Sequence, residues 1–195
     1  RGFSDGNNDL EVNYNGTFIN NGSLFPAFGY QRGVELQDRH ERRKRDLAPV
    51  VRANKLEDER FYNENFFGKG VSFIDFEATI STSEDQFAIA PGYLQSEKVE
   101  NGRRTFHYKM DAPMVNFYSI MSAKLSAKKE SYKGINIEIY YHEDHHMNVD
   151  RMIESVKDSI DYFTENFGPY QHKQMRIIEF PGYRSFAQSF ANTVP

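Results

Sequence analysis

The stretch "GINIEIYYHEDHHMNVD", residues 134–150, contains the point at which the hydrophobic pattern of the chain changes its period. Isoleucines recur at every second position from Ile135 to Ile139, which predicts a β-strand with side chains on alternating faces. From Val149 onward, apolar residues recur at steps of 3, 1, 3, 4, 3 and 4, which predicts an amphipathic helix: Val149, Met152, Ile153, Val156, Ile160, Phe163 and Phe167. Gly168-Pro169 is expected to end this helix, and "QMRIIEF", 174–180, is expected to be a buried strand.

The segment between strand and helix matches the HExxH signature of zinc proteases, as His142-Glu143-Asp144-His145-His146. Glu165 follows after eighteen intervening residues and is a candidate third ligand. In such a motif, a helix places both imidazoles on one face. Here the strand pattern runs into His142, and the helix pattern begins only at Val149. We therefore interpret the segment as a solvated connection, with two alternatives: a working zinc site of His142, His146 and Glu165, or a weak, non-catalytic metal contact by the histidines.

The middle of the chain is predicted to be antiparallel β structure. "VSFIDFEATIST", 71–82, alternates and is rich in β-branched residues. Asn101-Gly102 lies between two strand-like runs, which predicts a two-residue hairpin turn with strands near 92–100 and 103–110. Further strands are expected on both sides of a turn near Lys133-Gly134.

The first part of the chain is less regular. Residues 1–33 are rich in Gly and Asn and are expected to be loops around a short strand at Val12–Ile19. The charge run at 34–47 mixes acidic and basic residues, which favours a solvated helix over a nucleic-acid patch. A second short helix is expected at Leu56–Asn65.

Composition limits the possible classes of function. The 195 residues are 38% hydrophobic and 15% aromatic, which is enough for a folded core. The net charge of −4 argues against a nucleic-acid partner. The chain has no Cys, which excludes disulfides and thiolate metal sites. No apolar run approaches the ~20 residues that span a bilayer. The chain opens without Met and ends on "FANTVP", so we expect it to be a piece of a longer protein that carries any membrane segment elsewhere.

Several segments, in order, resemble the aminopeptidase N family of zinc metallopeptidases (gluzincins). "SLFPAFGYQRGVEL", 23–36, looks like that family's "FPxFDEP" segment, and "TFHYKMDAPMVNFYSIMSAKL", 105–125, resembles a later stretch of its N-terminal β domain. "GINIEIYYH" is similar to the last strand of that domain. "MIESVKDSIDYFTENFGPYQHKQMRIIEFPGY", 152–183, looks like the helix and strand that open the catalytic domain. The ordered set covers about 23–195 and is more specific than any one motif.

The chain also departs from that family's pattern. Gly29-Tyr30-Gln31 replaces the acidic "DEP", a variant associated with divergent bacterial members, some of which are fused to transporter-permease-like membrane helices. The family's "GAMEN" loop, whose Glu binds the free amino group of the substrate, should fall near 185–195, but "SFAQSFANTVP" contains no Glu. Gln188 and Asn192 are the nearest polar candidates for binding substrate. In that family the true HExxH lies downstream of this loop, which also argues against zinc at His142–His146.

The resemblance implies an α+β fold in which an antiparallel β-sandwich or saddle-like β domain precedes the first helix and strand of a thermolysin-like catalytic domain. We predict a loop-rich segment at 1–33, the later part of the β domain at 34–147, and the start of an incomplete catalytic domain at 148–195. The parent is expected to use zinc to hydrolyse peptides from their N-terminal end. This piece is expected to have no catalytic residue, no metal ligand and no activity.

One further alternative belongs to another class of function. The parent could use the peptidase-like fold as a binding or interaction domain of a membrane transporter-type protein, because the Glu of the substrate loop is missing. That parent would be extracytoplasmic, or anchored in a membrane through segments outside this chain. An intact HExxH motif downstream would favour the enzyme, and a degenerate one would favour the binding domain.

Overall fold

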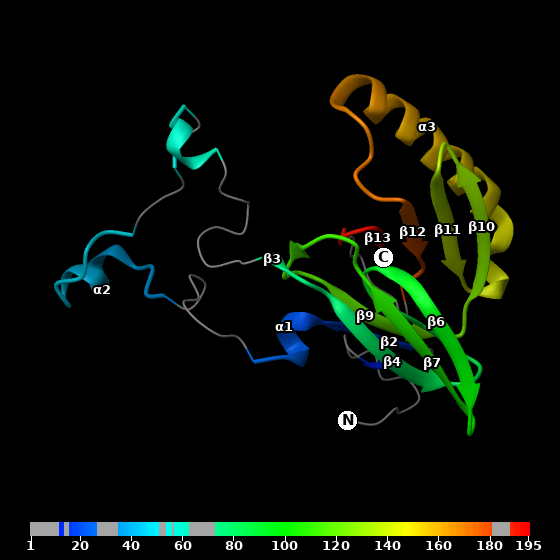
Figure 1. Cartoon of the computed structure of the whole chain (residues 1–195). Coiled ribbons are helices and arrows are strands. Elements are labelled where there is room, and N and C mark those ends of the chain that lie inside the picture. The colour runs from blue at the N-terminus through cyan, green and yellow to red at the C-terminus, as the bar shows by residue number, and fades with distance from the viewer. Residues whose placement is uncertain are drawn as a thin grey trace. The chain divides into compact units, whose positions relative to one another are not determined.

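The computed structural model describes residues 12–13, 16–26, 35–50, 54–55, 57–62, 73–180 and 188–195. Contacts divide the chain into two compact units, one formed by 1–25 with 73–195 and the other by 26–72. The described part of the first unit consists of small sheets and one long helix (Figure 1), so its class is α+β, as predicted. The division at 33 and 147 inferred from the resemblance stays a prediction.

The β-rich part of the first unit contains three antiparallel sheets. Their strand orders are β1-β2-β9-β5, β4-β7-β6 and β3-β8. The short helix α1 (Asn21–Leu24) follows β2. The strands are β1 (Val12–Asn13), β2 (Gly16–Asn20), β3 (Phe73–Ile74), β4 (Glu77–Ser83), β5 (Phe87–Ile89), β6 (Tyr93–Glu100), β7 (Arg103–Lys109), β8 (Met114–Val115) and β9 (Ser119–Ala123).

The predicted hairpin is confirmed. Glu100 pairs with Arg103, and the two residues between them have positive φ, 52° at Asn101 and 71° at Gly102. Both values are typical of the type I′ turns that match the twist of a hairpin. The predicted turn at Lys133-Gly134 is confirmed in the same way, with φ of 50° and 81°.

The remaining sheet is mixed and has the order β10-β11-β12-β13. Its strands are β10 (Ser126–Tyr132), β11 (Ile135–Tyr141), β12 (Gln174–Ile178) and β13 (Thr193–Val194). β10 is antiparallel to β11, whereas β11, β12 and β13 are parallel to one another. The helix α3 (Val149–Phe167) connects β11 to β12, because parallel neighbours need a crossover. Residues on both sides of the predicted boundary at 147 therefore share one sheet.

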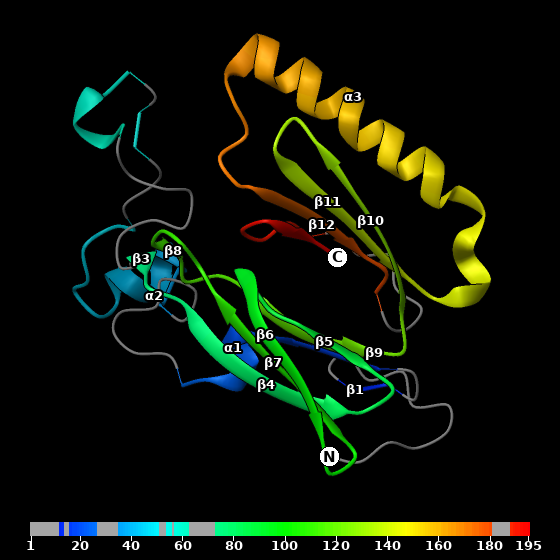
Figure 2. The ribbon, with the colours of Figure 1, turned by 45° about the vertical axis from the view of Figure 1, so that its right-hand side comes forward.

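Helix α3 confirms the predicted change of period and its predicted ends. It begins at Val149 and ends at Phe167, and Gly168 follows with φ of 114° and donates its N–H to the carbonyl of Phe163. Asn148 is the N-cap residue, but its side chain makes no capping hydrogen bond. Figure 2 shows α3 running along one face of the sheet, over β10 and β11.

Two hydrophobic clusters form the core of the first unit. The smaller one lies between α3 and the sheet, with Ile137, Ile139 and Ile153 at most 1% exposed. The opposite face of the sheet contributes Tyr140 and Ile178 to the larger cluster, which belongs mainly to the antiparallel sheets. Alternate residues of each strand thus pack on different layers, as period-2 patterning requires.

The second unit corrects two sequence-based predictions. The helix expected over 34–47 is only α2 (Arg39–Arg43), and it is not wholly solvated, because Arg42 is buried. The Arg42 guanidinium donates to the carbonyls of Leu36 and Ala48 and pairs with Glu35 at 2.8 Å, so side-chain bonds to the flanking chain replace further helical turns. The helix expected at Leu56–Asn65 is a single 3-10 turn, η2 (Glu59–Phe61), within the part of that range that the structure describes.

None of the helices in the described parts of the chain combines the length and the apolar character needed to cross a membrane.

Candidate functional site

The segment that matches the zinc signature is a 3-10 helix, η3 (Glu143–Asn148), rather than a loop or an α-helix. His142 precedes it in an extended conformation, with φ of −67° and ψ of 139°, and His145 interrupts it with φ of −104° and ψ of 26°. The regular i to i+4 geometry of an α-helix is therefore lost between His142 and His146. The two imidazoles do not share an α-helical face, as the sequence predicts.

Glu179, directly after β12, attaches this segment to the sheet. One carboxylate oxygen accepts the main-chain N–H of His142 at 2.6 Å, and the other lies 2.5 Å from Nδ1 of His145. Sequence reasoning did not identify Glu179, because no spacing rule links residue 179 to residue 145. The histidines of the motif-like segment thus take part in a structural connection at the end of β12.

Glu165 does not lie near these histidines. It is near the far end of α3, and a rise of about 1.5 Å per residue places it roughly 24 Å along the helix from Val149. Zinc ligands must lie about 2 Å from one metal ion. His142, His146 and Glu165 therefore do not fit a zinc ion, and the residues that the structure describes include no group of three His, Cys, Asp or Glu side chains able to hold a metal.

The predicted substrate-binding residues lie in the C-terminal segment beside β12. Phe190 and Thr193 form a β-bridge, and their main-chain groups exchange two hydrogen bonds, so 190–193 is a tight turn. Asn192 occupies this turn with φ of 52° and is 1% exposed. Gln188 is half-buried, and its buried Oε1 accepts no hydrogen bond from the residues that the structure describes. The structure brings both residues to one segment, and their role in binding stays a prediction.

A buried arginine underlies this turn. Arg176 of β12 is 1% exposed, and its Nη2 donates to Oδ1 of Asn192 at 3.0 Å and to the carbonyls of Ala90 and Gly92 at 2.6 and 3.1 Å. Its guanidinium also lies 5.4 Å from the ring centre of Tyr108. Burial lowers the pKa of Arg176 and raises that of Tyr108. Sequence reasoning included residue 176 in a buried strand but did not single it out.

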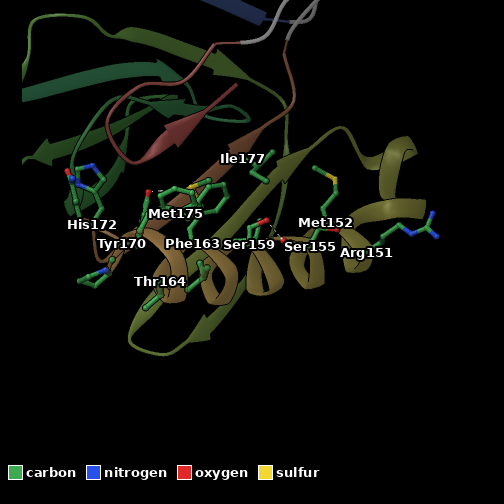
Figure 3. A pocket seen from close by; sticks show the side chains of 16 residues that line it. Arg151, Met152, Ser155, Ser159, Phe163, Thr164, Tyr170, His172, Met175 and Ile177 are labelled. Atoms are coloured by element: carbon green, nitrogen blue, oxygen red, sulfur yellow. Dashed lines mark hydrogen bonds between the residues drawn. The ribbon is translucent and has the colours of Figure 1, made fainter. Parts of the chain in front are cut away.

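A groove runs along α3 on the other face of the same sheet. Its volume is about 870 Å³, and Figure 3 shows side chains of α3 on one side and Met175 and Ile177 of β12 on the other. Helix α3 covers β10 and β11, so these two β12 residues are only partly buried. Phe163 and Phe167, which the helical period places on the apolar face, are 56% and 76% exposed.

The lining of the groove is better suited to apolar contacts than to catalysis. Tyr170 and His172 lie at one end of it and Arg151 is among its other lining residues. Burial lowers the pKa of His172, which the Asp111 carboxylate partly offsets, and burial raises the pKa of Tyr170 to about 12. The Ser159 hydroxyl donates to the carbonyl of Ser155, so it is not paired with a base. These features suit the burial of another apolar surface.

Comparisons with known proteins support the fold, and they do not assign a function. No protein-family model matches the chain, and no curated protein matches it. Among solved structures, the chain is similar to an M1 zinc metallopeptidase from Deinococcus radiodurans, with a TM-score of 0.54 and 15% identity, over 62% of this chain and 29% of that one. A variant of that enzyme bound to a Tyr-Ser-Ala substrate matches with the same values.

This similarity establishes a fold relationship with part of an M1 zinc metallopeptidase. The chain spans less than a third of the length of the enzyme it matches. At 15% identity the likeness concerns the path of the main chain and not the chemistry of a site.

Proposed function

We propose that this chain is the N-terminal portion of a zinc-dependent peptidase of the M1 type, inactive alone, whose parent hydrolyses peptides from their N-terminal end. The observation that supports the proposal most directly is the match of the fold to part of an M1 metallopeptidase. The ordered sequence resemblance to the aminopeptidase N family agrees with it independently. In this proposal, β11, α3 and β12 begin a thermolysin-like catalytic domain, and residues outside this chain bind zinc.

The open groove supports the incomplete catalytic domain. Parallel strands are normally covered on both faces, yet α3 leaves the β12 side of its face partly uncovered within the described residues. Phe163 and Phe167 extend the apolar surface along that side. The rest of a catalytic domain would bury this surface. A zinc ion in the parent would activate water for attack on the peptide bond, with a Glu as general base.

Gln188 and Asn192 are proposed to bind substrate within this parent. Among the described residues, the buried Oε1 of Gln188 has no hydrogen-bond donor, and peptide amino groups and main-chain amides are donors that it could accept from. We expect Gln188→Ala to raise KM for peptides with a free N-terminus while leaving zinc content unchanged. The same KM for the variant and the wild type would show that Gln188 does not bind substrate.

The proposal is tested by comparing two proteins made from one gene. The first is residues 1–195, and the second continues the reading frame to its stop codon. We expect the longer protein to contain zinc and to release product from a chromogenic peptide with a free N-terminus, but not from its N-acetylated form, while residues 1–195 release none. A longer protein without zinc that still binds peptides would instead indicate a binding domain, and activity in residues 1–195 would contradict the proposal outright.

A further inference from the structure

Arg176 is a buried cation whose side-chain hydrogen bonds connect β12 to two other segments of the first unit. It lies in β12 and donates to the carbonyls of Ala90 and Gly92, which connect β5 to β6, and to Asn192 in the C-terminal turn. In the described part of the chain no carboxylate forms an ion pair with it. Its Nε, also buried, has no hydrogen-bond partner among the same described residues. A buried charge is costly unless its donors are well satisfied, so this arrangement calls for a specific explanation.

Of the hydrogen bonds that Arg176 makes, those to Asn192 are the most specific. Arg176 contacts this residue twice, because its Nη2 donates to Oδ1 at 3.0 Å and its main-chain N–H donates to the carbonyl at 3.1 Å. Oδ1 also accepts the Thr193 hydroxyl at 3.2 Å. The Asn192 amide is 1% exposed, so these donors are what satisfies its oxygen. A buried amide oxygen that loses a partner favours conformations in which it reaches water.

We propose that Arg176 is a positioning residue that fixes the 190–193 turn: by binding the side chain of Asn192, it holds the backbone of that residue in the left-handed conformation. The claim rests on the proposed function only where it treats this turn as a substrate-binding segment. The positioning itself concerns residues 1–195 and is measured without substrate. The same guanidinium connects the turn to Ala90 and Gly92, so the geometry of the turn depends on the β5–β6 connection.

Hydrogen exchange at single amides tests this role. In the wild type, the Thr193 amide donates to the Phe190 carbonyl and the Glu179 amide donates to the Tyr140 carbonyl, at the other end of β12. We expect Arg176→Met to lower the protection of Thr193 about tenfold, the equivalent of one hydrogen bond, relative to that of Glu179. Global stability is a poor readout, because replacing a buried charge with an apolar side chain can be neutral.

Gln174 provides the matched control. It lies two residues before Arg176 on the same face of β12, is 6% exposed, and has an unpaired Nε2. Gln174→Met therefore also replaces a buried polar side chain with methionine, but it removes no bond to the turn. We expect the protection ratio of Thr193 to Glu179 to stay at its wild-type value in this variant.

A rescue variant separates positioning from general packing. Glycine adopts positive φ without strain and has no amide to bury, so Asn192→Gly in the Arg176→Met background should restore most of the lost Thr193 protection. If Arg176→Met does not fold, Arg176→Lys replaces it, because the lysine side chain is one bond shorter and its ammonium does not reach the position of Nη2, which makes all three side-chain bonds. An unchanged protection ratio in whichever variant folds would overturn the proposal, as would the absence of any rescue by glycine.

Discussion

Among the glycines that the structure describes, Gly92 is the one at which an added side chain would meet the closest main-chain atoms. Its φ is 93°, and a Cβ atom built there would lie 2.6 Å from the carbonyl carbon of Lys109 and 2.9 Å from the main-chain nitrogen of Met110. Neither contact can relax by moving a flexible side chain. We expect Gly92→Ala to lower the free energy of unfolding by about 3 kcal/mol, measured by urea denaturation of residues 1–195.

Gly134 is the control for this prediction at the scale of the residue. Its φ of 81° is similar, but apart from Gly134 and its two chain neighbours, no described residue has an atom within 4 Å of the corresponding Cβ position. Gly134→Ala therefore introduces backbone strain without a clash, and we expect it to cost only about 1 kcal/mol. Equal costs for the two variants would show that the close approach of the Lys109 main chain contributes nothing.

His172 gives the fold a measurable pH dependence. Burial lowers its pKa in the folded protein, so between the folded and unfolded pKa values the unfolded chain binds more protons. Stability therefore falls as the pH decreases below about 6.5, the usual pKa of the unfolded side chain. We expect His172→Gln to reduce the loss of stability between pH 7 and pH 5, as measured by urea denaturation. The same loss in variant and wild type would show that His172 makes no such contribution.

Single residues differ in how well their roles could be predicted from the sequence. Asn101-Gly102 was predictable because a type I′ turn depends only on the two residues that form it. The roles of Arg176 and Glu179 depend on partners 84 to 86 and 34 to 37 positions away in the sequence. The sequence therefore predicted the turn, but not the buried arginine or the anchoring carboxylate.

At the scale of the element, α3 has a buried part and an open part. Ile153 is 1% exposed against β11, whereas Phe163 is 56% exposed beside the groove. We expect Ile153→Ala to destabilise residues 1–195 by about 3 kcal/mol and Phe163→Ala by less than about 1 kcal/mol. In the longer protein of the proposed function, Phe163→Ala should cost distinctly more. Equal costs of Phe163→Ala in both proteins would show that no further segment covers the groove.

Elements with a sustained period were predicted well, and short ones were not. Helix α3 repeats its apolar spacing over its whole length, so the prediction of a helix does not depend on any single residue of the pattern. The run at 34–47 has few apolar residues, and its outcome, the five-residue α2, depends on Arg42 binding main-chain carbonyls on both sides. In and before the 3-10 helix at 143–148, His145 and the His142 amide bind Glu179, which directly follows β12. Composition alone indicates neither outcome.

At the scale of the whole molecule, the order of elements was more informative than any motif. Strands followed by one long helix and a further buried strand predicted an α+β fold, and the fold of the chain is similar to part of an M1 metallopeptidase with a TM-score of 0.54 at 15% identity. The HExxH match suggested zinc ligands at His142 and His146 because it depends on residue types at five positions and ignores their conformation. Spatial distance between the candidate ligands decides the question.

The last prediction concerns zinc in residues 1–195. His142 is extended, His145 interrupts η3, and Glu165 lies roughly 24 Å along α3 from Val149, so the literal motif lacks a common metal position. We expect the purified chain, incubated with equimolar zinc and then desalted, to retain far less than one zinc per molecule. His142→Ala and Glu165→Ala should retain the same small amount as the wild type. One tightly bound zinc per chain, lost in either variant, would require a conformation that brings both ends of α3 to one metal ion and would restore the motif as a working site.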